Sequence, residues 1–198
     1  MKNPIDVLFG VGINDLKVGR SYPFFQRWRN MLDRCYGPAG RRQYRAYAGC
    51  TVAPEWLVFS NFRAWMLRQP WEGNHLDKDL LFPGNKVYSP EFCVFVDAQT
   101  NTLLNQQLDK RGKYPIGVSF DKSRGSFQSK IRRYSRTYNL GRYGDPMVAH
   151  SVWQREKALL IREIALTQRD WRVRTALVSW ADRLDEDRRL GRESLGRC

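Results

Sequence analysis

The sequence is poor in the residues that most often build metal centres and disulfide frameworks. It contains two histidines and four cysteines, the latter at Cys35, Cys50, Cys93 and Cys198. No two cysteines form a C-x-x-C pair, which excludes the usual spacing of a structural zinc site. Because the cysteines are widely spaced and no export signal is recognisable, we expect reduced thiols and a cytoplasmic location.

Long apolar runs and acidic residues are also scarce. No stretch of about 20 apolar residues occurs, so we expect no bilayer span, and residues 1–6 lack the apolar core of a signal peptide. The chain has 34 basic and 20 acidic residues, a net charge of +14. Such a surplus repels itself in the folded state, and a polyanionic partner compensates it. We therefore expect nucleic acid and no membrane as the partner; a solvated basic surface is the alternative.

The first third of the chain has the spacing of helices with an aromatic core. Apolar residues recur at three- and four-residue steps from Phe24 to Cys35, and Gly37-Pro38 ends the pattern. A second helix is predicted from Pro54, with Trp56, Phe59, Phe62 and Trp65 on its apolar face. Large aromatic side chains at helical spacing are typical of a buried core.

The pattern changes between residues 75 and 105. Residues 75–81 predict a short strand, Pro83-Gly84-Asn85 a turn, and residues 93–96 a second strand. Asp97 can cap a short helix that runs to Leu104. The sequence therefore predicts a strand-turn-strand-helix unit here.

Beyond a linker at residues 110–113 the apolar period becomes two, which predicts three antiparallel strands up to Tyr143. Asp145-Pro146 then has the form of a helix N-terminus, and another amphipathic helix follows from about Thr167. We expect this last helix to pack on the body of the protein or to form a homodimer contact. The predicted fold class is α+β. The predicted domains are 1–109 (helical, with the strand-turn-strand-helix unit), 110–166 (sheet on a helix) and 167–198 (C-terminal helix).

The basic residues concentrate on the predicted sheet. Residues 111–142 hold nine basic residues and one acidic residue, Asp121. Strand side chains alternate between faces, so one face can be cationic and suited to DNA phosphates and base edges. A second basic stretch lies in the loop after the first helix. The residues that we expect to bind DNA are Arg41, Arg42, Arg45, Lys122, Arg124, Gln128, Lys130, Arg132, Arg133, Arg136 and Arg142.

Residues 112–165 resemble an AP2-type DNA-binding domain. The resemblance is carried by Gly117-Val118-Ser119-Phe120, by Phe127-Gln128-Ser129-Lys130-Ile131 and by Leu140-Gly141-Arg142-Tyr143, with the helix after Asp145. That family reads double-stranded DNA with a three-stranded sheet packed on one helix. The resemblance implies the same arrangement and the same partner for this segment.

A second segment is similar to phage HNH homing endonucleases. It comprises Asn74-His75-Leu76-Asp77-Lys78-Asp79, then Tyr88-Ser89-Pro90-Glu91-Phe92-Cys93-Val94-Phe95-Val96, and Asn101. By resemblance, His75 is the general base that activates water, and Asp77 and Asp79 complete the catalytic set. Asp77, Asn85 and Asn101 would supply oxygens to Mg²⁺ or Mn²⁺. An HNH module followed by an AP2-like module is a known homing-endonuclease order, which implies a phage-encoded protein in a host cytoplasm.

The HNH pattern is partly degenerate. Phe92 stands where the family has a metal-binding or histidine-orienting Asn, and it can do neither. The segment also resembles related phage proteins that have Leu-Asp-Arg-Ile-Asp and lack the histidine. Two other interpretations therefore stay open beside a DNA endonuclease. One is a non-catalytic DNA-binding regulator or anti-defence factor, and the other is an inhibitor that binds a host protein.

Overall fold

The computed structural model describes residues 6–38, 47–104 and 113–194, and its chain divides into two compact units. Unit 1 ends at Ala98 and unit 2 begins at Gln99. The fold is α+β, as the sequence predicts. We describe each unit by itself. None of the described helices is long and apolar enough to cross a membrane.

The described residues of unit 1 include two α-helices and three short strand pairs. The hairpin β1 (Asp6–Leu8) and β2 (Gly12–Asn14) precedes α1 (Pro23–Tyr36). Next come β3 (Thr51–Val52), the 3-10 helix η2 (Pro54–Leu57) and α3 (Phe59–Met66). The strands β4 (His75–Asp77) and β6 (Val94–Val96) are antiparallel, whereas β5 (Val87–Tyr88) runs parallel to β3. The helix predicted from Pro54 is thus two pieces, because Val58 between them is extended.

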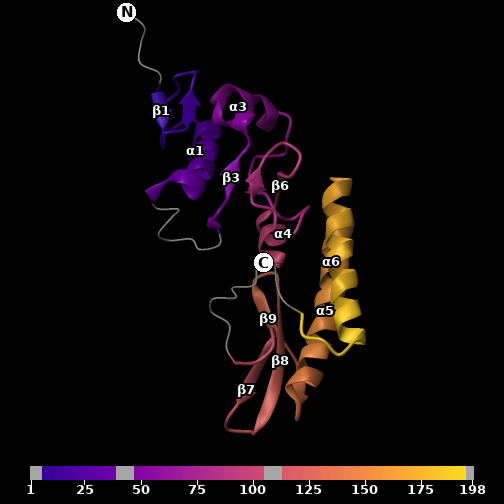
Figure 1. Cartoon of the computed structure of the whole chain (residues 1–198). Helices are drawn as coiled ribbons and strands as arrows, with labels where there is room; N and C mark the ends of the chain where they lie inside the picture. The colour runs from indigo at the N-terminus through magenta and orange to yellow at the C-terminus, as the bar shows by residue number, and fades with distance from the viewer. Residues whose placement is uncertain (1–5, 39–46, 105–112, 195–198) are drawn as a thin grey trace, which may run out of the picture. The chain divides into compact units, whose positions relative to one another are not determined.

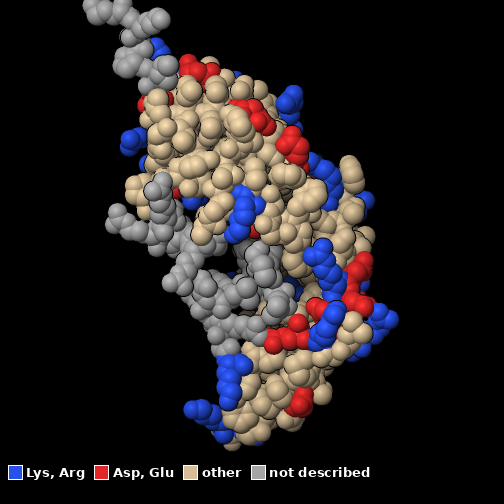
Figure 2. Space-filling model, in the orientation of Figure 1, with Lys and Arg blue, Asp and Glu red and all other residues tan. Residues whose placement is uncertain are grey.

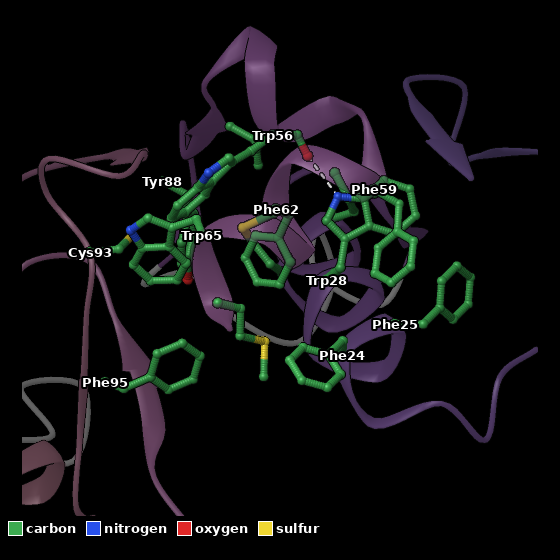
Figure 3. Close-up of a cluster of buried hydrophobic side chains, with 14 of the residues drawn as sticks. Phe24, Phe25, Trp28, Trp56, Phe59, Phe62, Trp65, Tyr88, Cys93 and Phe95 are labelled. Carbon is green, nitrogen blue, oxygen red and sulfur yellow. Dashed lines mark hydrogen bonds between the residues drawn. The ribbon is translucent and has the colours of Figure 1, made fainter. Parts of the chain in front are cut away.

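Aromatic residues form the core of unit 1, as predicted (Figure 3). Trp28, Trp56, Phe59 and Phe62 are almost fully buried. The indole nitrogen of Trp28 donates a 2.6 Å hydrogen bond to the Trp56 carbonyl, so the largest side chain of α1 fixes the 3-10 turn. Buried aromatic rings of this size each remove about 150–250 Å² from water, which explains how so short a set of strands is held together.

Unit 2 contains a three-stranded antiparallel sheet with one long helix packed on it and a second long helix packed on the first (Figure 1). The strands β7 (Val118–Asp121), β8 (Ser126–Arg133) and β9 (Arg136–Tyr143) pair in sequence order. The short α4 (Ala98–Leu103) starts at the last residue of unit 1. The sheet is followed by α5 (Pro146–Thr167) and α6 (Trp171–Arg189).

Sequence signals set the N-terminus of α5. Asp145 accepts hydrogen bonds from the backbone nitrogens of Met147 and Val148, and Pro146 occupies the first turn, as predicted. The helix α6 packs along α5, where Arg162 pairs with Asp182 and Asp185. The C-terminal helix therefore belongs to the same unit as the sheet. The sequence predicts domain boundaries at 109/110 and 166/167.

Candidate nucleic-acid interface

The central strand β8 separates a buried face from a charged one. Ser129 and Ile131 are buried, and α5 packs against this strand. Lys130 and Arg132 alternate with them and are exposed. Alternate residues of a strand point to opposite faces, so Lys130 and Arg132 project away from α5. The sequence predicted this alternation.

The pairing of residues between neighbouring strands extends this charged face across β7, β8 and β9. Gln128 of β8 pairs with Ser119 of β7 and with Arg142 of β9. Lys130 pairs with Asn139, and Arg132 with Thr137. Directly paired residues share a face. We call the resulting set the outer face: Ser119, Gln128, Lys130, Arg132, Thr137, Asn139 and Arg142.

An irregularity in β9 determines which residues reach the outer face. The register shifts between Ser129 and Lys130, so that Leu140 has no direct partner on β8. Gly141 adopts a φ of +127°, and a Cβ there would lie 2.7 Å from the Tyr143 hydroxyl. An extra residue of this kind restarts the alternation of a strand. Asn139 and Arg142 therefore both belong to the outer face although they are three positions apart.

One acidic residue lies beside this face. Asp121 Oδ2 is 2.6 Å from Arg142 Nη1. The Ser123 hydroxyl and then the Arg142 guanidinium hold the pKa of Asp121 down at about 2. Asp121 is consequently ionised at neutral pH and offsets one of the three cations of the outer face.

The remaining predicted DNA-binding residues separate into three groups. Lys122 and Arg124 are exposed in the β7–β8 turn. Arg133 pairs with Glu163 of α5, and Arg136 is its direct partner across the hairpin, so these two lie on the α5 side of the sheet. The loop residues of the prediction fall outside the described residues: Arg41, Arg42 and Arg45.

The surface charge of unit 2 is uneven (Figure 2). In the view shown, basic side chains project over the sheet, whereas basic and acidic side chains are mixed over the helices. Near the end of α6, Arg188 pairs with Asp185 and Arg192 with Asp187. On the outer face, Lys130 and Arg132 make no ion pair among the described residues.

The HNH-like segment forms a small antiparallel pair in unit 1. His75 lies opposite Val96 and is exposed, and Asp77 lies opposite Val94 and is buried. Asp77 Oδ1 accepts hydrogen bonds from the backbone nitrogens of Asp79 and Leu80, at 2.9 and 2.7 Å. These bonds close the turn that follows β4. The predicted strand therefore ends at Asp77 instead of Leu81.

A lysine occupies the centre of the following loop. The ammonium of Lys78, a residue only 5% exposed, donates to Asp79 Oδ2 and to the Asn85 carbonyl, each at 3.0 Å. The Asn85 side chain donates to the carbonyls of Lys78 and Val87 and accepts from the Val87 nitrogen. Asp77 and Asn85, which were predicted to bind a metal ion, thus form hydrogen bonds that stabilise the loop around the Lys78 ammonium.

This arrangement does not fit a divalent ion as it stands. Oδ1 of Asp77 and Oδ1 of Asn85 both accept backbone hydrogen bonds, and Lys78 already supplies positive charge to Asp79. The third predicted ligand, Asn101, lies on α4 in unit 2. Within residues 6–38, 47–104 and 113–194, no three His, Cys, Asp or Glu side chains form a group that could hold a metal.

A second polar cluster, around His150, holds the C-terminal segment. His150 is fully buried, with Nδ1 2.8 Å from the Ile116 carbonyl and Nε2 accepting from the Ser194 nitrogen at 3.1 Å. The Ser194 hydroxyl donates to Asp187 and accepts from Gln154. The histidine thus accepts from the serine backbone, and the cluster joins α5 to the segment that follows α6.

Two groups of polar residues in unit 2 were not identified as candidate site residues from the sequence. Thr137 and Asn139 belong to the outer face, and the hairpin register at the Arg133–Arg136 pair was the signal that could have placed them. Lys157 is buried on α5 in line with Trp153, Leu160 and Ile164. Its position within an apolar stripe of helical spacing was readable from the sequence.

No protein-family model, characterised protein or solved structure matches this chain. The chemistry of the described residues therefore carries the functional argument alone.

Proposed function

We propose that the protein binds double-stranded DNA through the outer face of the β7–β8–β9 sheet. The observation that carries the proposal is the row Gln128, Lys130 and Arg132 on β8, which projects away from α5. Arginine and lysine bind phosphates, and arginine and glutamine can also form paired hydrogen bonds with guanine and adenine edges. This row therefore combines residues that position DNA with residues that read it.

The dimensions of the sheet suit the major groove. Neighbouring strands lie about 4.8 Å apart, so three strands span about 10 Å, and the major groove of B-DNA is about 12 Å wide. The helix α5 packs on all three strands, and α6 packs on α5. A sheet supported in this way can enter the groove without rearranging, which limits the entropic cost of binding.

Salt dependence is the direct test, because each neutralised phosphate releases counterions. Fluorescence anisotropy with a labelled duplex of about 20 base pairs would give Kd between about 0.05 and 0.3 M salt. We expect Lys130→Gln with Arg132→Gln to reduce the slope of log Kd against log salt by about 2. The matched control is Arg155→Gln with Arg189→Gln, two exposed cations of α5 and α6.

Two results would contradict the proposal. One is an affinity that does not depend on salt in the unmodified protein. The other is an equal loss of affinity in the outer-face variant and in the helix variant, because net charge alone would then explain binding.

DNA cleavage is a second proposal, and it rests on the position of His75. This histidine is exposed at the start of β4 and belongs to a strand pair of the order that the HNH resemblance implies. Supercoiled plasmid incubated with Mg²⁺ or Mn²⁺ should then be nicked, and His75→Ala should abolish nicking. If the plasmid stays intact while DNA is bound, the non-catalytic alternative, a regulator or anti-defence factor, holds. The backbone hydrogen bonds of Asp77 and Asn85 favour that alternative.

A further inference from the structure

Unit 2 contains a cavity of about 470 Å³ between α4, α5 and the end of β8. Sites for small molecules commonly have volumes of about 300–1,000 Å³. Leu103, Leu160 and Ile164 are buried and give the cavity an apolar wall. Polar groups are contributed by Gln99, Lys157 and Arg132. The cavity thus has the size and the mixed lining of a ligand site.

Lys157 is the unusual member of this lining. The residue is only 9% exposed, and in the part of the chain that the structure describes it has neither an ion pair nor a hydrogen bond. Buried lysines are almost always paired, because an unpaired ammonium out of water is costly. Burial accordingly lowers the pKa of Lys157 to about 8. At neutral pH Lys157 is therefore protonated in most molecules, and this cation has no counter-ion among the described residues.

The one other charged residue of the described lining, Arg132, has the same sign, although its side chain belongs to the outer face. Arg132 is exposed and makes no ion pair among the described residues. No Asp or Glu belongs to the described lining. The nearby Glu163 is engaged, because it pairs with Arg133 and accepts from the Tyr134 hydroxyl at 3.0 Å. The described lining of the cavity therefore has one buried cation, Lys157, and no acid beside an apolar wall.

We propose that this cavity binds a small anion whose phosphate or carboxylate group pairs with Lys157, while its apolar body contacts Leu103, Leu160 and Ile164. Such a ligand would supply the counter-ion that Lys157 does not find among the described residues, and charge-assisted hydrogen bonds are the stronger ones. The site is separate from the DNA-binding proposal, since Lys157 is buried on α5 and only Arg132 is shared with the outer face.

Isothermal titration with four probes would test the site: phenyl phosphate, benzoate, inorganic phosphate and benzylamine. We expect phenyl phosphate or benzoate to bind with a millimolar or lower Kd. Inorganic phosphate should bind at least tenfold more weakly because it lacks the apolar body, and the cationic benzylamine should not bind. The two anionic aromatic probes distinguish a phosphate from a carboxylate ligand.

The decisive variant is Lys157→Met, which keeps most of the side-chain volume and removes the charge. It should weaken binding of the anionic probes at least tenfold, whereas Arg155→Met, which removes an exposed cation of the same helix, should not. Equal binding by the two variants would overturn the proposal, and so would equal binding of benzoate and benzylamine or no binding of any anion at 10 mM or so. DNA affinity should be unchanged in Lys157→Met. A loss of DNA affinity would show that the cavity is part of the DNA-binding surface and would overturn the proposal of a separate site. If the unmodified protein does not bind DNA, the titration with the anionic probes still tests the cavity.

Discussion

Arg142 and Asp121 form an ion pair across the sheet, with 2.6 Å between Nη1 and Oδ2, although they are 21 residues apart in the chain. This pair neutralises an arginine that shares the outer face with Gln128. We predict that Asp121→Asn strengthens DNA binding about fivefold at 0.1 M salt, because it adds roughly one available phosphate contact. The salt slope should become steeper by about 1 in the same anisotropy measurement.

The matched control removes an acid from the opposite side of the sheet. Glu163→Gln makes the same change in net charge but acts on Arg133, which lies on the α5 side. Its effect on DNA affinity should be less than half as large on a logarithmic scale. The ratio of affinities between Asp121→Asn and the unmodified protein should stay constant from pH 5 to pH 8, because the pKa of Asp121 near 2 keeps the carboxylate ionised throughout. A ratio that changes within this range would contradict the proposed ion pair.

Gly117 allows the sheet and α5 to approach each other. Its φ is +80°, and a Cβ at this position would lie 2.1 Å from Cδ1 of Trp153. We predict that Gly117→Ala lowers the free energy of unfolding of unit 2 by about 3 kcal/mol, the sum of a left-handed backbone cost of about 1–2 kcal/mol and an overpacking cost of similar size. Urea unfolding followed by tryptophan fluorescence and circular dichroism would measure the loss.

Gly125 separates the two contributions. Its φ is +59°, and nothing lies within 4 Å of a Cβ built there. Gly125→Ala should therefore cost only the backbone contribution, about 1 kcal/mol. If the two variants lose the same stability, the contact with Trp153 is not what requires glycine at position 117.

The sheet of unit 2 was predictable because its signals are local. Period-two alternation along β8 placed Ile131 inside and Lys130 outside, and Asp145-Pro146 marked the start of α5. Each signal follows from the geometry of one element. The faces of β9 were not predictable in the same way, since the irregularity at Gly141 depends on pairing with β8.

The candidate metal centre was less predictable from the sequence because its residues have competing partners. By resemblance, Asp77 is predicted to bind a metal ion, but its Oδ1 accepts hydrogen bonds from two backbone nitrogens of the turn. Lys78 lies within the HNH-like segment, but no role was assigned to it from the sequence. It is buried, and its ammonium donates hydrogen bonds to two groups of the loop. Whether a polar side chain serves chemistry or closes a turn depends on backbone positions that spacing does not specify.

Asp77 allows a test between these roles. Asparagine keeps an Oδ1 that can accept from the nitrogens of Asp79 and Leu80, whereas alanine removes it. If Asp77 acts as a turn acceptor, Asp77→Asn should lose less than about 1 kcal/mol of stability and Asp77→Ala about 2–3 kcal/mol. DNA binding should be unchanged in both. A plasmid-nicking activity that Asp77→Asn abolishes without loss of stability would instead support the catalytic role.

Lys157 gives unit 2 a characteristic dependence of stability on pH. The folded-state pKa is about 8, below the ordinary lysine value of 10.5. Below pH 8 both the folded and the unfolded protein carry the proton, so the cost of the buried charge is fully present. Between about pH 8 and 10.5 the unfolded chain binds more protons, and stability therefore rises with pH in this window. The total rise due to Lys157 is on the order of 3 kcal/mol, from about 1.4 kcal/mol per pKa unit.

We predict that Lys157→Met is more stable than the unmodified protein at pH 7 and that the difference shrinks as the pH is raised to 10. The difference between the two proteins isolates Lys157, because every other titratable group is present in both. Urea unfolding at pH 7, 8, 9 and 10 would measure it. Phenyl phosphate at saturating concentration should reduce the difference at pH 7, since the ligand supplies the counter-ion. A difference that does not change with pH would show that Lys157 keeps an ordinary pKa in the folded protein and is not buried without a partner.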